Sequence, residues 1–441
     1  MAAWAIGLIV FALMMAMVFA GIPIFISMLS CSFIGFFALY GGDLKMALNI
    51  FTTYPFELGA NYNYAVLPMF MLVGALAGET GIAEGAFRSV HSFLGRVKGG
   101  LLFTVVGANA LFGACSGSSV AGNIVFGRLA MPELEKAGYN RKYSLGCVAA
   151  SGALSTLIPP SMGIIMFCLV APITMSVGTA LMGGIIPGIV TAVALCLTVR
   201  LIGTMHPGAI PPGGGEKIPI AEKLKSLRFL IPILLLFGLI IGGTFVGWFT
   251  ATVGGAVGAV AVLIYAFVKK LPMKKIGASL VDAAIMEAGI FPIIVAGQIF
   301  SKFIADTGLA DFLSAGIAAI SAPRFVIFLL VIVLYVFCGC VMDIMSIIII
   351  TVPVVFPILT RMGYSPYALV IALCFVAEIA GLTPPIGMNV FATANALRIN
   401  PSEIFKGVVP YFICEILLVL LIGLFPQIVT FLPALLGQSV T

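Results

Sequence analysis

The chain has 441 residues, of which 62% are hydrophobic and only 9% are charged. Soluble globular proteins carry about 25% charged residues, so this composition excludes a soluble domain and indicates a protein with many membrane spans. The net charge of +6 is no sign of nucleic-acid binding, because an excess of Lys and Arg also marks the cytoplasmic loops of membrane proteins.

Apolar runs long enough to cross a bilayer recur along the whole chain, for example at 229–247, 250–268 and 408–426. About 20 apolar residues cross the hydrocarbon core as a helix, and unbroken runs exclude the alternating pattern of a β-barrel. The sequence therefore predicts an all-α polytopic membrane protein. The first run has no signal-peptide features, and we expect residues 1–64 to form N-terminal scaffold helices.

The next segment, 65–205, contains two features that membrane helices avoid. One is the small polar cluster Ser116-Gly117-Ser118-Ser119, between the short apolar arms of 100–131, and the other is Pro159-Pro160. Non-helical backbone at membrane depth survives only where protein buries it or where it lines a cavity. We therefore expect 100–131 to be a re-entrant inner hairpin with the serines at its tip, followed by a helix broken at the prolines.

The connector, 206–275, begins with a flexible Pro/Gly-rich loop. It continues as a charged amphipathic arm helix at 216–228 and two apolar helices, and it ends in a basic loop around Lys269 and Lys270. Two crossings place both basic segments on one side of the membrane, and the positive-inside rule makes that side the cytoplasm.

The segment 276–432 repeats the pattern of 65–205. Pro384-Pro385 follows Pro159-Pro160 at an offset of 225 residues, and further matches before and after it keep the same order. The repeat predicts an outer hairpin at 324–356 with its tip at 339–343, a second broken helix, and a C-terminal tail at 433–441. Five crossings separate the two hairpins, an odd number, so the repeats are inverted, as in many secondary transporters.

This layout gives about ten membrane spans besides the two hairpins. It leaves only four of the 22 Lys and Arg residues outside the cytoplasm, namely Lys45, Lys302, Arg324 and Arg361. That asymmetry supports the predicted orientation.

The broken helices are candidate cation sites. A proline removes an amide donor and blocks the carbonyl four residues back, so the carbonyls of Ser155, Thr156, Ala380 and Gly381 are released for a cation such as sodium. The hairpin tips supply further oxygen ligands. In the first site these come from Ser116 and Ser119, and in the second from Gly339, Asp343 and the hydroxyl of Thr383.

Helix amino termini at the tips and breaks favour an anionic substrate at the midplane. Candidate substrate contacts are Gly117, Ser118, Asn123 and Asn389. Structural hydrogen bonding is an open alternative for Asn389. Glu378 is an acid within apolar sequence, where functional roles are common, and bracing of the broken helix is its open alternative.

These motifs resemble the large membrane (M) subunit of tripartite ATP-independent periplasmic (TRAP) transporters, within the ion-transporter superfamily. The resemblance is carried by 116–119, by 151–161, by 339–343 and by 378–389, and it extends through nearly the whole chain. It implies an elevator-type carrier that imports a small organic anion, such as a carboxylate, sialic-acid-like compound or sulfonate, together with two or more Na⁺ ions.

The resemblance also assigns ligands, partners and a location. By position, the family's first sodium site falls on Ser116, Ser119, Ser155, Ile158 and Pro160, and its second on Gly339, Ala380, Thr383 and Ile386. The implied partners are a small four-helix membrane subunit, a periplasmic substrate-binding protein and the lipid bilayer of the bacterial inner membrane.

Three other functions are weighed against this one. A stand-alone ion-coupled anion symporter or exchanger needs no periplasmic partner, and a passive anion channel needs no inverted pair of sites. An enzyme is disfavoured because the sequence has neither a His-Glu-x-x-His motif nor a cluster of His, Asp and Glu.

Overall fold

The computed structural model describes residues 2–212, 219–319, 323–385 and 387–438. The described residues form helices and no strand, which confirms the predicted all-α fold class. Five helices are individually long and apolar enough to cross a membrane, or up to eight spans if each bent pair counts as one, while five further apolar helices are shorter, all within the described parts of the chain.

The N-terminal segment forms a series of helices. They are α1 (Ala3–Phe19), α2 (Ile24–Leu39), α3 (Leu44–Gly59), η1 (Tyr62–Ala65), α4 (Val66–Glu79) and α5 (Ile82–Leu94). The chain bends by 54° between α3 and the segment Tyr62–Glu79. Asn61 stabilises the restart by accepting a hydrogen bond from the amide of Asn63.

The first hairpin and the first broken helix follow. The helices are α6 (Gly100–Ser116), α7 (Ser119–Lys136), α8 (Arg141–Ser151), α9 (Leu154–Leu157), α10 (Met162–Val170) and α11 (Val177–Met205). The segment Arg141–Leu157 is bent by 48° from α10. The break falls at the double proline, as the sequence predicts, and the second hairpin arm continues beyond residue 131 to Lys136.

The connector contains the described part of the arm helix, α12 (Ile220–Ser226), and η2 (Leu227–Phe229). Residues 216–218 of the predicted arm lie outside the described residues. The chain continues through α13 (Ile231–Phe237), a π-helical segment η3 (Gly238–Gly242), α14 (Gly243–Phe245) and α15 (Ala251–Val268).

The last third repeats the order of the first hairpin and broken helix. Its helices are α16 (Met273–Thr307), α17 (Leu309–Ala319), α18 (Arg324–Gly339), α19 (Ile344–Arg361), α20 (Pro366–Ala380), α21 (Met388–Leu397), α22 (Pro401–Leu424) and α23 (Gln427–Leu435). Hairpin α18–α19 corresponds to α6–α7, and the break between α20 and α21 corresponds to the break between α9 and α10.

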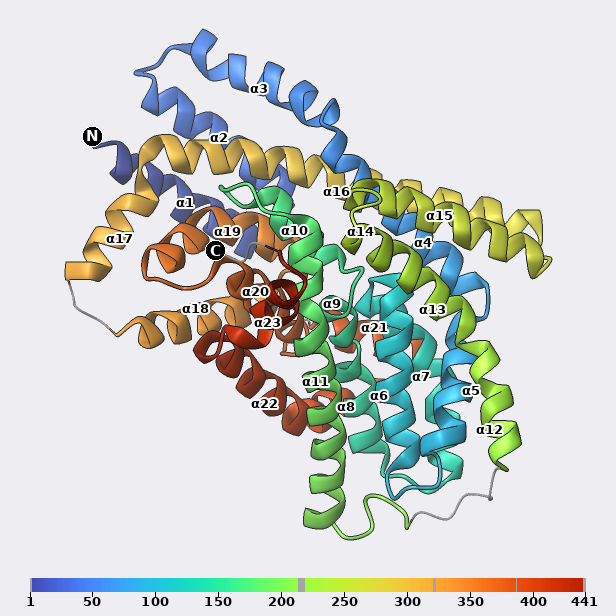
Figure 1. The fold of residues 1–441 in the computed structure, drawn as a ribbon. Coiled ribbons are helices and arrows are strands. Elements are labelled where there is room, and N and C mark those ends of the chain that lie inside the picture. Colours follow the sequence, from blue (N-terminus) through green and yellow to red (C-terminus); the bar gives the residue numbers. More distant parts are fainter. Residues whose placement is uncertain (1, 213–218, 320–322, 386, 439–441) are drawn as a thin grey trace.

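The two repeats exchange contacts in a reciprocal way. The second arm of each hairpin packs on the helix that follows the break in the other repeat, so that α7 contacts α21 and α19 contacts α10. In the same way, α8 packs on α22 and α20 packs on α11. Glycines allow one of these approaches, because a methyl group on Gly146 or Gly407 would overlap the backbone of the facing helix. Figure 1 shows both hairpins on the same side of the long helix α16, which runs beside α2 and α4.

Candidate substrate and ion site

The first hairpin tip lies against the first helix break. Helix α6 ends at Ser116, and Gly117 after it has a φ of 60°, in the left-handed region that glycine tolerates. Ser118 then caps the start of α7, its hydroxyl accepting a hydrogen bond from the amide of Ala121 at 3.3 Å. A methyl group on Gly117 would lie 2.6 Å from the carbonyl oxygen of Pro160, so the absence of a side chain lets the tip reach the break.

Replacing Gly117 with alanine is therefore expected to lower transport by about tenfold, which corresponds to about 1.4 kcal/mol. Gly138→Ala is the matched control, because Gly138 also has a positive φ of 77° but nothing within 4 Å of an added methyl group. Both variants carry the backbone penalty, and only Gly117→Ala adds the collision. Equal uptake rates in reconstituted vesicles would contradict this account of the tip.

Oxygen atoms without partners gather at the first break. Prolines 159 and 160 cannot donate to the carbonyls of Ser155 and Thr156, and no other described group donates to them. The buried hydroxyl oxygen of Ser155 also has no hydrogen-bond partner among the described residues. Unpartnered buried oxygens are costly, and carbonyl and hydroxyl oxygens are ligands that hard cations prefer.

The remaining residues of the predicted first ion site lie around this break. Ser116 and Pro160 are buried, while Ile158 is partly exposed and packs toward Gly188 of α11. Ser116 and Ser119 both line a cavity at the hairpin tip. The structure thus brings the tip and the break together, and the ligand assignment itself stays a prediction.

The second tip also meets its break, but its oxygens are used differently. Gly339 lies so close to Ala380 that an added methyl group would overlap it. The Ala380 carbonyl accepts the hydroxyl of Thr383 at 2.6 Å, and the Gly381 carbonyl accepts the amide of Asn389 at 3.1 Å. Ile386, the remaining predicted ligand, lies outside the described residues.

The carboxylate of Asp343 caps helix α19. One of its oxygens accepts the amides of Met345 at 3.0 Å and Ser346 at 3.3 Å, and the other accepts the Ser346 hydroxyl. This arrangement satisfies amides that the first turn of a helix leaves free. The side chain therefore holds the tip of the second hairpin to its second arm.

Glu378 joins the two broken helices. It is 3% exposed; one carboxylate oxygen accepts the hydroxyl of Thr156 at 2.7 Å, and the other accepts the side-chain amide of Asn389 at 2.6 Å. Thr156 comes from the first break and Asn389 from the segment after the second. Hydrogen bonds to a charged acceptor are short and strong, so this three-residue clasp fixes the two breaks relative to each other.

A cavity of about 220 Å³ lies between these elements. The first tip, from Ser116 to Ala121, contributes one wall, and Thr156, Met162, Gly163 and Glu378 contribute the wall at the break. Ile344 and Met345 reach it from the second hairpin, while Met71, Gly74, Ala75, Met286 and Ile290 close it from α4 and α16. Glu378 is the one charged residue of this described lining.

The predicted substrate contacts divide into two groups. Gly117 and Ser118 line the cavity, whereas Asn123 and Asn389 do not. Asn123 is 0% exposed and donates to the carbonyl of Ala149 at 3.3 Å, and Asn389 is engaged by Glu378. In this structure both asparagine side chains make internal hydrogen bonds, which is the alternative that the sequence left open for Asn389, and their role as substrate contacts stays a prediction.

Sequence reasoning missed the wall that α4 and α16 provide. A methyl group on Gly74 of α4 would lie 2.6 Å from the carbonyl oxygen of Ser116, so this glycine lets α4 touch the hairpin tip. The signal was present, because Gly74 and Gly78 form a G-x-x-x-G pattern typical of close helix approach in membranes.

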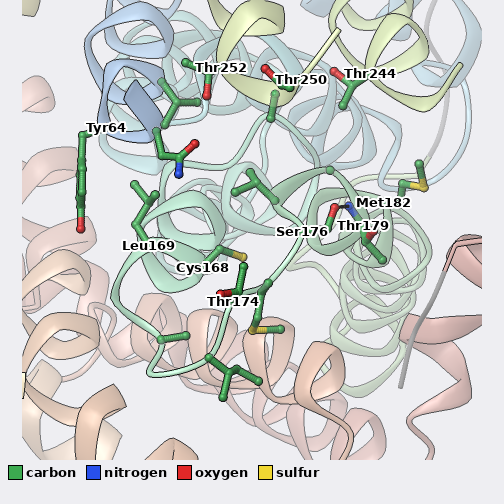
Figure 2. A pocket seen from close by; sticks show the side chains of 18 of the residues that line it. Tyr64, Cys168, Leu169, Thr174, Ser176, Thr179, Met182, Thr244, Thr250 and Thr252 are labelled. Carbon is green, nitrogen blue, oxygen red and sulfur yellow. Dashed lines mark hydrogen bonds between the residues drawn. The ribbon is translucent and has the colours of Figure 1, made fainter. Parts of the chain in front are cut away.

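A second, larger pocket of about 630 Å³ lies between α10–α11 and the start of α15. Figure 2 shows hydroxyl groups around it, with Thr244, Thr250 and Thr252 in one row and Thr174, Ser176 and Thr179 contributed by another segment. None of its described lining residues is charged. On the predicted orientation it opens at the non-cytoplasmic end of these helices.

Two inverted hairpins and two interrupted helices around a central cavity are the architecture of a secondary transporter. The comparison with known proteins identifies the family. Residues 11–428 match the family described as tripartite ATP-independent periplasmic transporter, DctM component. The chain belongs to this family and is the large, multi-pass inner-membrane subunit of a TRAP transporter, which confirms the resemblance seen in the sequence.

Relatives with several substrates match over most of their length. The C4-dicarboxylate TRAP transporter large permease protein DctM of Rhodobacter capsulatus is 29% identical, with 98% of this chain and 100% of that protein covered. The ectoine TRAP transporter large permease protein TeaC of Halomonas elongata is 28% identical, covering 96% and 98%. The sialic acid TRAP transporter large permease protein SiaM of Vibrio cholerae is 27% identical, covering 85% and 87%.

A solved structure supports the fold. The YdaH transporter of Alcanivorax borkumensis superposes with a TM-score of 0.60 at 18% sequence identity, covering 87% of this chain and 90% of that one. At this identity the likeness concerns the fold alone.

Proposed function

We propose that this chain imports a small organic anion together with sodium ions by an elevator movement. In this proposal a periplasmic binding protein delivers the anion and a small membrane subunit completes the transporter. The observation that carries the proposal is the first break, where unpartnered oxygens of Ser155 and Thr156 lie next to a hairpin tip that lines a cavity.

Sodium suits this set of oxygens. In the described part of the chain no cluster of three His, Cys, Asp or Glu residues could hold a metal ion, whereas backbone carbonyls and hydroxyls coordinate sodium in other transporters with unwound helices. A bound cation would satisfy the buried oxygens of Ser155 and Thr156 and draw the tip toward the break. Ion binding would thereby shape the cavity wall to which the substrate binds.

The first turn of α7 supports an anionic substrate. Ser119, Val120 and Ala121 line the cavity, and within the described residues no acceptor takes the amides of Ser119 and Val120. An 18-residue helix presents free amides and partial positive charge at this end, which favours an anion. The described lining holds neither Lys nor Arg, so these amides and the tip hydroxyls would bind the anionic group.

The elevator movement rests on the way the cavity is divided. Hairpins and broken helices form one side of the cavity, while α4 and α16 form the other. Gly74 of α4 lets this second side touch the first hairpin tip. Sliding the hairpin side along α4 and α16 would carry the bound anion and sodium across the membrane. The relatives are named for C4-dicarboxylates, ectoine and sialic acid. These names support a small carboxylate-containing compound as the class of substrate.

Transport in reconstituted vesicles tests this function. The chain, its small membrane subunit and its binding protein would be combined, and a thermal-shift screen on the binding protein would supply the ligand. We expect uptake against a concentration gradient with an inward sodium gradient and only background uptake when choline replaces sodium. Uptake that ignores sodium would refute the coupling.

Two further measurements separate the alternatives. Accumulation of the anion against its electrochemical gradient distinguishes a coupled carrier from a passive channel, because a passive channel cannot drive uphill transport. Accumulation without the binding protein would favour a stand-alone symporter or exchanger. We expect saturable accumulation that requires all three components.

A further inference from the structure

Two carboxylates in the described membrane-spanning helices have buried oxygens without a partner: Glu415 of α22, which is 0% exposed, and Glu287 of α16, which is partly exposed beside a groove. Glu287 lies on α16, is only partly exposed, and takes part in no hydrogen bond or ion pair with any described residue; its buried oxygen Oε2 is unpartnered. Acids at membrane depth are costly and usually face a partner or a polar cavity. The cavity of the transport site does not include Glu287.

The depth of Glu287 follows from the helix geometry. Lys275 near the start of α16 is bound to Glu79 at the end of α4, with 2.9 Å between the ammonium nitrogen and the carboxylate oxygen, which places both at the basic, cytoplasmic end. Glu287 is 12 residues further along α16, about 18 Å at 1.5 Å per residue. The hydrocarbon core is about 30 Å thick, so Glu287 lies near its middle.

A groove of about 510 Å³ surrounds this carboxylate on the outer side of α4 and α16. All its other described lining residues are apolar: Pro68, Met69, Leu72, Leu280, Ala283, Ala284, Ala288 and Phe291. Ala284 and Ala288 are exposed and four residues apart, the small-residue spacing that allows another helix to approach closely. Neighbouring Val281 and Ile285 are 57% and 64% exposed, so the apolar surface extends beyond the groove.

We propose that this groove binds a transmembrane helix of the small membrane subunit, with a lysine or arginine of that helix facing Glu287. Charge complementarity selects this occupant, because an acyl chain would fill the groove but leave the carboxylate unpaired. The small side chains of Ala284 and Ala288 bring the partner backbone close, and a long basic side chain then reaches the carboxylate. The inference rests on the proposed function, in which such a subunit is present.

Site-specific photo-crosslinking tests the surface directly. A benzoylphenylalanine placed at Ala284 or Ala288 in the co-expressed full transporter should crosslink to the small membrane subunit, identified by mass spectrometry. The control position is Ile264 on α15, which is 57% exposed and lies outside the groove. Crosslinks to lipid alone, to a second copy of this chain, or equally from Ile264 would overturn the proposal.

The charge is tested by substitution. Glu287→Gln and Glu287→Leu leave a basic partner unpaired, and we expect about tenfold less small subunit to co-purify with the tagged chain. Asp282→Asn is the matched control, because Asp282 is exposed on the same helix and does not line the groove. Unchanged recovery in both Glu287 variants would overturn the role of the carboxylate. Crosslinking and co-purification are measured without transport. A failure of this proposal can therefore be distinguished from a failure of sodium-driven uptake.

Discussion

Replacing Glu378 with alanine is expected to abolish sodium-dependent uptake. The change removes both acceptors of the clasp and leaves the hydroxyl of Thr156 and the amide of Asn389 without their partner in a buried site. Breaking a buried hydrogen-bonded charge network costs about 3–5 kcal/mol. Since the clasp sets the two breaks against each other, we expect uptake to fall by more than about 100-fold.

Glu378→Gln separates the geometry of the clasp from its charge. A glutamine can accept from Asn389 through its carbonyl and donate to the Thr156 hydroxyl through its amide, so it keeps both contacts at lower strength. We expect it to retain more uptake than Glu378→Ala, with an intermediate melting temperature. A Glu378→Gln variant as inactive as Glu378→Ala, yet as stable as the native protein, would show that the charge acts on ion or substrate directly.

A double-mutant cycle between Thr156→Val and Asn389→Ala measures whether the clasp acts as a unit. The two residues bind opposite oxygens of Glu378, so their effects on melting temperature should be strongly non-additive. Independent, additive losses would mean that each residue supports its own broken helix and that Glu378 does not couple them.

The tips and breaks could be predicted from the sequence because they are local exceptions to the apolar pattern. Ser116-Gly117-Ser118-Ser119 and the double prolines stand out within apolar runs, and the structure ends α6 at Ser116 and interrupts the chain at Pro159. The existence of the second hairpin and of the second break followed from the repeat. These features depend on residues close in sequence, where backbone chemistry alone decides the outcome.

The clasp could not be predicted in the same way. Thr156 and Glu378 are 222 residues apart, and no local pattern states which acceptor a buried threonine will find. Asp343 illustrates the same limit, because an acid at a hairpin tip can bind an ion or cap the next helix, and in the structure its carboxylate caps α19. Side-chain partners across an interface depend on how the helices pack, which the sequence pattern does not specify.

Replacing Gly74 with alanine is expected to impair transport without unfolding the protein. The added methyl group would lie 2.6 Å from the carbonyl oxygen of Ser116, a backbone atom that cannot turn aside as a flexible side chain can. Overpacking of this kind costs about 1–3 kcal/mol, and uptake should fall by about tenfold or more. The measurement is the initial rate of sodium-driven uptake, compared with the melting temperature.

Gly78→Ala provides the matched control, one helical turn further along α4. Gly78 is exposed and has nothing within 4 Å of an added methyl group, so this variant carries the same change in helix propensity without the collision. Alanine favours helix over glycine by about 1 kcal/mol, which means that both variants should be at least as helical as the native chain. If the hairpin slides along α4 during transport, only Gly74→Ala should lower the uptake rate. Its added methyl group collides with Ser116 in the state in which the hairpin tip touches α4, whereas the methyl group of Gly78→Ala meets nothing. Equal rates for both variants would mean that this contact takes no part in the transport cycle, and the division of the cavity into a moving and a fixed side would have to be abandoned.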